Sequence, residues 1–170
     1  MVIRRMIKAV CFDLGDTLVA EETVVHNSSG QATTAHVIHG ALEVLAAIRK
    51  EAYKIAMIAN GDSAGVRNII KATGLQDYFD ATIISEEVAI EKPCQGIFEA
   101  ALAKLGVKAK NAVMVGNKIE ADILGANRLG MKSVWFKWNA RYSDTVESSQ
   151  EKPDFTINSL FQLPVLVASM

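Results

Sequence analysis

The sequence has 170 residues, half of them hydrophobic, and a formal net charge of -1 at pH 7. This length and hydrophobicity suffice for one folded domain with a substantial core and exclude an intrinsically disordered chain. Basic and acidic residues are interspersed without a basic stripe, so we expect no nucleic-acid partner.

The sequence carries no pattern typical of secretion or of membrane insertion. Arg4 and Arg5 precede an apolar patch, but Lys8 interrupts it before it reaches the length of a signal-peptide core. The apolar tail at 163–170 is too short to span a bilayer. The two cysteines lie far apart without a CxxC pair, which is typical of reduced thiols. We therefore expect a cytoplasmic protein with no membrane partner.

Short apolar runs alternate with amphipathic patterns along most of the chain. The runs predict buried strands at 8–12, 54–59, 81–85, 112–115, 133–136 and 155–157. Between them, apolar residues recur at helical spacing in four groups: Leu42, Leu45 and Ile48; Val66, Ile69 and Ile70; Phe98, Leu102 and Leu105; Ile123, Leu124 and Leu129. This alternation predicts an α/β fold, a three-layer, Rossmann-like parallel sheet with helices on both faces.

Glycines mark the ends of three of the expected helices. Each is followed by an apolar residue, as a left-handed C-terminal cap with its hydrophobic contact requires. The glycines are Gly74, Gly106 and Gly130.

The polar segment 20–38 interrupts the alternation. It is rich in Thr, Ser and Ala and has no helical periodicity, and TVVH and ATTAH flank NSSG within it. This arrangement favours a short hairpin or flap. We expect it to be an insert in a single domain that covers 1–170.

The stretch AVCFDLGDTLV at 9–19 is the most informative in the chain. Its apolar run ends in Asp13, and Gly15 permits a sharp turn that would present this carboxylate at the carboxyl end of a buried strand. Ligands bind at that edge in open α/β sheets. An aspartate there can also simply cap a turn, so the rest of the chain has to decide between the two interpretations.

Four segments carry a family resemblance. FDLGDTL at 12–18 resembles the first motif of the haloacid dehalogenase-like (HAD) hydrolases, in which an aspartate nucleophile is followed by any residue, a second aspartate, any residue, and Thr or Val. Later motifs of the family resemble, in the same order, IAMIANGD at 55–62, EKPCQGIFEAAL at 91–102 and VMVGNKIEADILGANRLGM at 113–131. Many members carry a helical cap domain, which segment 20–38 is too short to form.

The resemblance implies a set of site residues. Asp13 falls on the nucleophile that forms an aspartyl-phosphate, and Lys92 on the cation that pairs with it and with the phosphoryl oxygens. The main-chain N–H groups of Asn60 and Gly61 would hold the phosphate. The family's Mg²⁺ site maps onto an Asp13 oxygen and three further positions: the Gly15 carbonyl, Asn117 and Asp122.

Three motif positions depart from the family pattern. The second aspartate is Gly15, the second-motif Ser or Thr is Ala59, and the first acid of the fourth motif is Asn117. The second aspartate moves the proton in this family, and such proton transfer is typically worth about 10²- to 10⁴-fold, so turnover should be slow. Asp16 is adjacent, but its side chain should point elsewhere. Alternative proton carriers near the flap are His26, His36 and His39, which also fit exposed surface positions.

Three functions remain open at this stage. The first is a Mg²⁺-dependent phosphatase that acts through Asp13 on a phosphorylated small molecule or on an exposed phosphate of a larger substrate. The second is a non-catalytic phospholigand-binding or regulatory pseudo-phosphatase, favoured by the three departures. The third is a 2-haloacid dehalogenase, which ranks lower because the enclosing cap is missing. A neighbouring subunit of a homo-oligomer could supply a lid.

Overall fold

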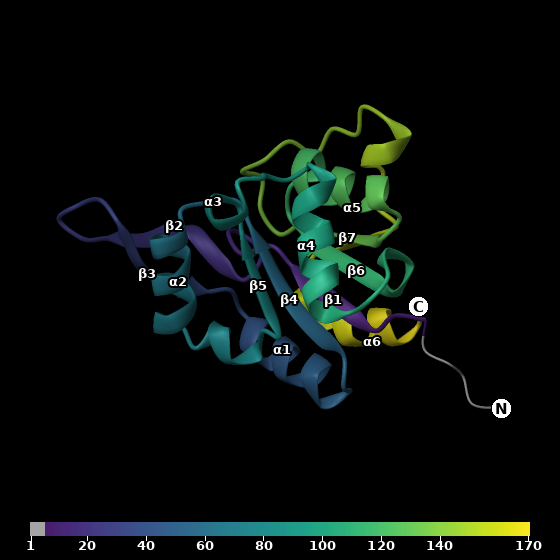
Figure 1. Ribbon diagram of the computed structural model, residues 1–170, viewed down its shortest axis with the longest axis horizontal. Coiled ribbons are helices and arrows are strands. Elements are labelled where there is room, and N and C mark those ends of the chain that lie inside the picture. The colour runs from purple at the N-terminus through teal and green to yellow at the C-terminus, as the bar shows by residue number, and fades with distance from the viewer. Residues whose placement is uncertain (1–5) are drawn as a thin grey trace.

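A parallel six-stranded sheet forms the centre of the computed structural model, which describes residues 6–170 and so leaves Arg4 and Arg5 outside the described residues (Figure 1). The strand order is β5-β4-β1-β6-β7-β8. The strands are β1 (Ala9–Phe12), β4 (Lys54–Ala59), β5 (Ala81–Ile84), β6 (Ala112–Gly116), β7 (Lys132–Phe136) and β8 (Phe155–Ile157). The predicted parallel α/β architecture is confirmed, and each predicted strand agrees with an observed one to within one residue at either end.

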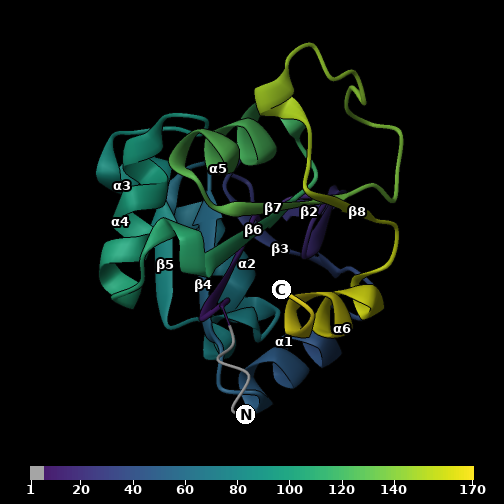
Figure 2. The same ribbon diagram turned by 90° about the vertical axis from the view of Figure 1, so that its right-hand side faces the viewer.

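Helices cover both faces of this sheet (Figure 2). They are α1 (Ala41–Lys50), α2 (Ser63–Ala72), α3 (Ser85–Val88), α4 (Gln95–Leu105), α5 (Leu124–Leu129) and α6 (Leu163–Ala168). The helices α1, α2 and α6 pack on one face together with Val10 and Phe12 of β1. The helices α4 and α5 pack on the other face with Ala9 and Cys11. Because alternate side chains of β1 enter opposite cores, the whole strand is buried.

The expected left-handed glycines are present at the ends of all three helices. Gly106 and Gly130 adopt left-handed conformations and end α4 and α5. Gly74 is also left-handed and follows Thr73 at the end of α2, where its N–H donates to the Lys71 carbonyl at 3.2 Å.

The fourth predicted helix differs in its first turn. It begins as a π-helical turn at Ile119–Ile123 and becomes α-helical only at Leu124. The Ile123 N–H donates to the Lys118 carbonyl at 3.3 Å, which is the spacing of a π-helix, and the Lys118 N–H donates to Asp122 Oδ2 at 3.0 Å. Apolar spacing carries no signal for such an arrangement, which is frequent at functional sites.

The polar segment forms the predicted hairpin, which projects from the end of the sheet (Figure 1). Its strands are β2 (Val19–His26) and β3 (Ala32–Val37), which pair antiparallel. The hairpin starts four residues earlier than the TVVH stretch because Val19 pairs with Val37 near its base. The start of β3 contacts α2, where Asn68 Nδ2 donates to the Ala32 carbonyl at 3.0 Å.

The carboxyl ends of β1, β4 and β6 lie side by side in the middle of the sheet. The loops that follow them carry Asp13, Asn60 and Asn117. Within residues 6–170, no helix combines the length and the apolar character needed to cross a membrane.

Candidate active site

Asp13 directly follows β1 and faces a buried lysine. Its own N–H donates to the Val115 carbonyl at 3.0 Å, which continues the pairing of β1 with β6. Asp13 Oδ1 lies 2.6 Å from Lys92 Nζ, and Oδ2 accepts a hydrogen bond from Thr17 Oγ1 at 3.2 Å. The side chain is about one-tenth exposed, so one carboxylate oxygen is fixed by the lysine while the group still reaches the surface.

Lys92 holds three acceptors at once. Besides Asp13, its Nζ donates to Asp122 Oδ1 at 2.7 Å and to the Ile58 carbonyl at 2.8 Å, which uses all three donors of an ammonium group. Burial on its own would lower the pKa of this lysine, but the two carboxylates outweigh burial and raise the pKa above its usual value. Lys92 is therefore a fixed cation at the base of the site.

Asn60 positions Lys92 through its side chain. The Lys92 N–H donates to Asn60 Oδ1 at 2.9 Å, and Asn60 Nδ2 donates to the Lys92 carbonyl at 3.2 Å. Sequence reasoning considered the main chain of Asn60 and missed this contact. The Gly61 N–H donates to Ser85 Oγ at 3.0 Å, so a phosphate bound there would have to replace the serine.

Asp122 is fully buried and uses both of its oxygens. Oδ1 accepts from Lys92 and Oδ2 accepts from the Lys118 N–H. Burial, followed by the charge of Asp13, raises the pKa of Asp122. Each oxygen accepts one hydrogen bond and keeps a second lone pair.

The donor set for a cation consists of oxygens from two loops, the one after β1 and the one after β6. The Asn117 side-chain amide lies 3.1 Å from Asp13 Oδ2 and 3.2 Å from the Gly15 carbonyl oxygen. With Nδ2 on that side, the amide donates to both oxygens. With Oδ1 on that side, this oxygen lies 3.1 Å and 3.2 Å from the other two, which is about the 3 Å spacing of adjacent ligands around Mg²⁺. The residues present therefore fit the ion.

This candidate cation site, formed by Asp13, the Gly15 carbonyl and Asn117, differs from a metal site made of several acids. Within the part of the chain that the structure describes, no three His, Cys, Asp or Glu side chains gather as a metal site. A cation at Asp13 would depend on the Asn117 amide and the Gly15 carbonyl, which contribute no formal charge.

Two tryptophans fix the loops beside the site. Trp135 Nε1 donates to the Asn117 carbonyl at 3.0 Å, and Trp138 Nε1 donates to the Asp16 carbonyl at 2.6 Å. The Asp16 carboxylate is buried and lies 2.9 Å from Arg141 Nε, so it is engaged in an ion pair.

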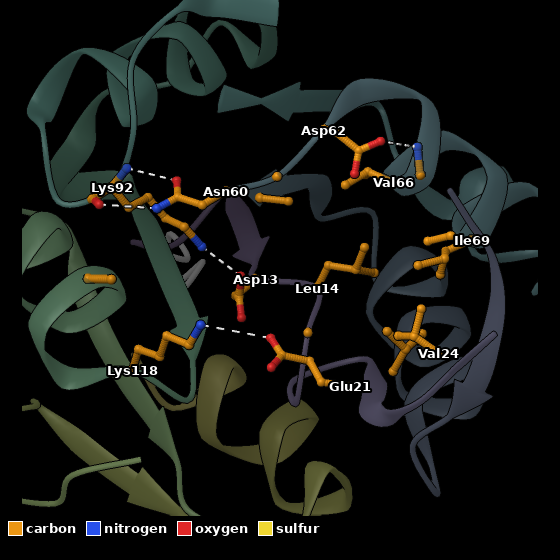
Figure 3. A pocket seen from close by; sticks show the side chains of 17 residues that line it. Asp13, Leu14, Glu21, Val24, Asn60, Asp62, Val66, Ile69, Lys92 and Lys118 are labelled. Carbon is orange, nitrogen blue, oxygen red and sulfur yellow. Dashed lines mark hydrogen bonds and ion pairs between the residues drawn. The ribbon is translucent and has the colours of Figure 1, made fainter. Parts of the chain in front are cut away.

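A pocket of about 220 Å³ opens above Asp13 and Lys92 (Figure 3). Its charged end also contains Glu21 and Lys118, two residues that sequence reasoning missed. Its other end is lined by apolar side chains of the first loop, the hairpin and α2, which are Leu14, Val19, Val24, Ala32, Val66 and Ile69. None of the three histidines near the hairpin lines this pocket.

Residues 29–130 match the sequence profile of the haloacid dehalogenase-like hydrolases. The chain belongs to this family. A structural likeness agrees with the assignment: the HAD phosphatase from Thermococcus onnurineus superposes with a TM-score of 0.80 at 22% identity, covering 95% of this chain and 98% of that one. At this level of identity the likeness concerns the fold.

Curated relatives of this HAD-like chain include phosphatases. A glyceraldehyde 3-phosphate phosphatase of Pyrococcus furiosus is 35% identical over 126 residues, which cover 74% of this chain and 52% of the relative. A pyrimidine 5'-nucleotidase of Escherichia coli is 41% identical over 129 residues, which cover 75% and 55%. The chain thus spans about half the length of the curated relatives it matches.

Proposed function

We propose that this HAD-like chain is a Mg²⁺-dependent phosphatase that acts through an aspartyl-phosphate on Asp13. The carrying observation is the contact of Lys92 Nζ with Asp13 Oδ1 at 2.6 Å in the base of an open pocket. A buried cation beside a carboxylate is what attack on a phosphoryl group needs, because both reactants are negatively charged. The relatives named as phosphatases support the same reaction class.

The site residues divide this work among them. Asp13 attacks the phosphorus, and Lys92 neutralises charge on the phosphoryl oxygens and keeps the carboxylate in place. Asp13 Oδ2, the Gly15 carbonyl and Asn117 would hold Mg²⁺, with the charge of Asp122 close by. When bound, the ion supplies positive charge for the phosphoryl group. Asn60 positions the lysine, and the N–H groups of Asn60 and Gly61 are the phosphate donors we propose.

The pocket favours a phosphorylated small molecule that has an apolar part. Its charged end suits the phosphate, and the apolar side chains of the hairpin and α2 lie at the other end (Figure 3). In this proposal the hairpin takes the place of a cap within a single domain.

The experiment is hydrolysis of p-nitrophenyl phosphate with Mg²⁺ and with excess EDTA. We expect turnover only when Mg²⁺ is present. A lack of turnover in Mg²⁺ would contradict the proposal.

Asn117→Asp should raise the affinity for Mg²⁺. The substitution adds a negative charge beside Asp13 Oδ2 and the Gly15 carbonyl, so we expect half-maximal activation at a roughly tenfold lower Mg²⁺ concentration. A Mg²⁺ titration of activity, together with the rise in unfolding temperature at each concentration, measures this change. Asn139→Asp, in the neighbouring loop, is the control. An unchanged titration for Asn117→Asp would place the ion elsewhere.

A non-catalytic phospholigand-binding module is the second candidate. The occupied Gly61 N–H, the missing hydroxyl at Ala59 and the uncharged Asn117 favour it. In that case calorimetry with inorganic phosphate would give binding heat, while the aryl phosphate would remain intact in the presence of Mg²⁺.

A further inference from the structure

The carboxyl group of Glu21 occupies the space beside Gly15. A Cβ atom built on Gly15 would overlap Glu21 Oε1 and would lie 2.7 Å from its Cγ and 2.8 Å from its Cδ. A side chain at position 15 and the present Glu21 carboxyl therefore compete for the same volume. Gly15 stands at the position of the motif's second aspartate, and the space beside it is filled by the carboxyl group of Glu21 from β2.

We propose that Glu21 is the general acid and base of this site, supplying from β2 the carboxyl group that position 15 lacks. The inference rests on the proposed phosphatase function. It replaces the expectation that proton transfer is impaired because Gly15 stands in place of the second aspartate.

The hairpin fixes Glu21 at the mouth of the pocket. The Glu21 N–H donates to Asp16 Oδ1 at 2.9 Å, and Asp16 is itself buried and paired with Arg141. Two residues along a strand share a face, so Glu21 follows the buried Val19 on the inner face of β2. Its side chain extends toward Asp13 and Lys118 (Figure 3).

Two further side chains orient the carboxyl group. Tyr142 Oη donates a short hydrogen bond to Glu21 Oε2. Burial and this contact raise the pKa of Tyr142, so it remains a donor. Lys118 Nζ lies 3.8 Å from Oε1. The Glu21 side chain is one-third exposed, so a substrate and water can reach it.

The other acids of the pocket are committed elsewhere. Among the described residues that line it, the carboxyl groups belong to Asp13, Glu21 and Asp62. Asp13 is the nucleophile in the proposal, and Asp62 Oδ1 accepts from the Gly65 N–H at 2.7 Å as the N-terminal cap of α2. Glu21 is therefore the acid available for proton transfer.

The reaction balances with this one group. In the first half, an Asp13 oxygen bonds to phosphorus, the bond from phosphorus to the ester oxygen breaks, and the leaving oxygen takes the proton of the Glu21 carboxylic acid. In the second half, the Glu21 carboxylate takes a proton from water as the water oxygen bonds to phosphorus. The bond between phosphorus and Asp13 then breaks, which releases inorganic phosphate and restores both side chains.

The test compares leaving groups in Glu21→Gln. Nitrophenolate leaves without a proton, whereas an alkoxide needs one. We expect kcat/KM to fall by about 10²- to 10⁴-fold for an alkyl phosphate and by less than about threefold for p-nitrophenyl phosphate. The kcat for p-nitrophenyl phosphate should also fall, because the Glu21 carboxylate activates water after the leaving group has departed. The control is Glu22→Gln, whose carboxylate pairs with Arg141 on the exposed side of β2.

A swap of the two positions provides the second variant. Glu21→Ala with Gly15→Asp removes the overlap and returns an acid to the motif, so we expect kcat/KM for the alkyl phosphate to recover at least tenfold over Glu21→Ala. Thermal unfolding of every variant verifies that it is folded.

If the wild-type chain shows no Asp13-dependent turnover, both this inference and the proposed function are wrong. If it turns over and Glu21→Gln keeps the wild-type leaving-group dependence, this inference alone is overturned.

Discussion

Asp13→Asn is expected to lower kcat for p-nitrophenyl phosphate in Mg²⁺ by on the order of 10⁴-fold or more, as removal of a catalytic nucleophile does elsewhere. Asparagine has the shape of aspartate and still offers an oxygen to Lys92, while its NH₂ group can donate to Thr17 Oγ1. Its amide, however, is a poor nucleophile and cannot form an acyl phosphate that water then cleaves. Initial rates measure the loss, and acid quenching during turnover should trap phosphate on the wild-type chain alone.

Asp62→Asn is the matched control for this substitution. Asp62 lines the same pocket, and asparagine caps helices about as well as aspartate, so activity should stay within about threefold of wild type. Asp13→Asn should also remain folded, because Lys92 keeps one carboxylate partner in Asp122. Retention of more than about a tenth of wild-type activity would mean that the nucleophile is another group.

Local signals made most of the fold predictable. Buried strands and glycine caps depend on residues that are neighbours in the sequence. The predicted bounds of β1, β4 and β6 therefore lie close to the observed ones. The start of β2 cannot be predicted from neighbouring residues, because Val19 becomes a strand residue by pairing with the distant Val37. The π-helical turn around Asp122 has a main-chain bond from Ile123 to Lys118 and a side-chain bond from Lys118 to Asp122, and apolar periodicity predicts neither of them.

Part of the site was predictable from the sequence. The order and spacing of the motifs predicted Asp13, Lys92 and Asp122 as site residues, and in the structure these three belong to one hydrogen-bonded group. Glu21 gave no such signal, because its place beside Gly15 follows from the register of the hairpin. Its partner Tyr142 comes from a distant loop without periodicity. An acid missing from one motif could have prompted a search for acids in the adjoining strand.

Lys92→Met is expected to destabilise the fold by about 3 to 5 kcal/mol near pH 8 in the absence of metal, because it leaves buried carboxylates without their cation. Asp122 is fully buried and Asp13 nearly so, and they would repel each other as well as lose a donor. The surface pair of Lys132 with Asp154, at 2.9 Å, provides the control, since Lys132→Met should cost no more than about 1 kcal/mol.

The loss in Lys92→Met should shrink as the pH falls from 8 to 5. Burial and Asp13 already raise the pKa of Asp122 above that of an unfolded aspartate, and removal of the lysine raises it further. The folded variant therefore binds a proton that the unfolded chain does not, which stabilises it toward low pH. Urea unfolding at both pH values measures the difference. Adding Asp122→Asn should recover part of the loss at pH 8, and an equal loss at both pH values would mean that an unpaired carboxylate is not its cause.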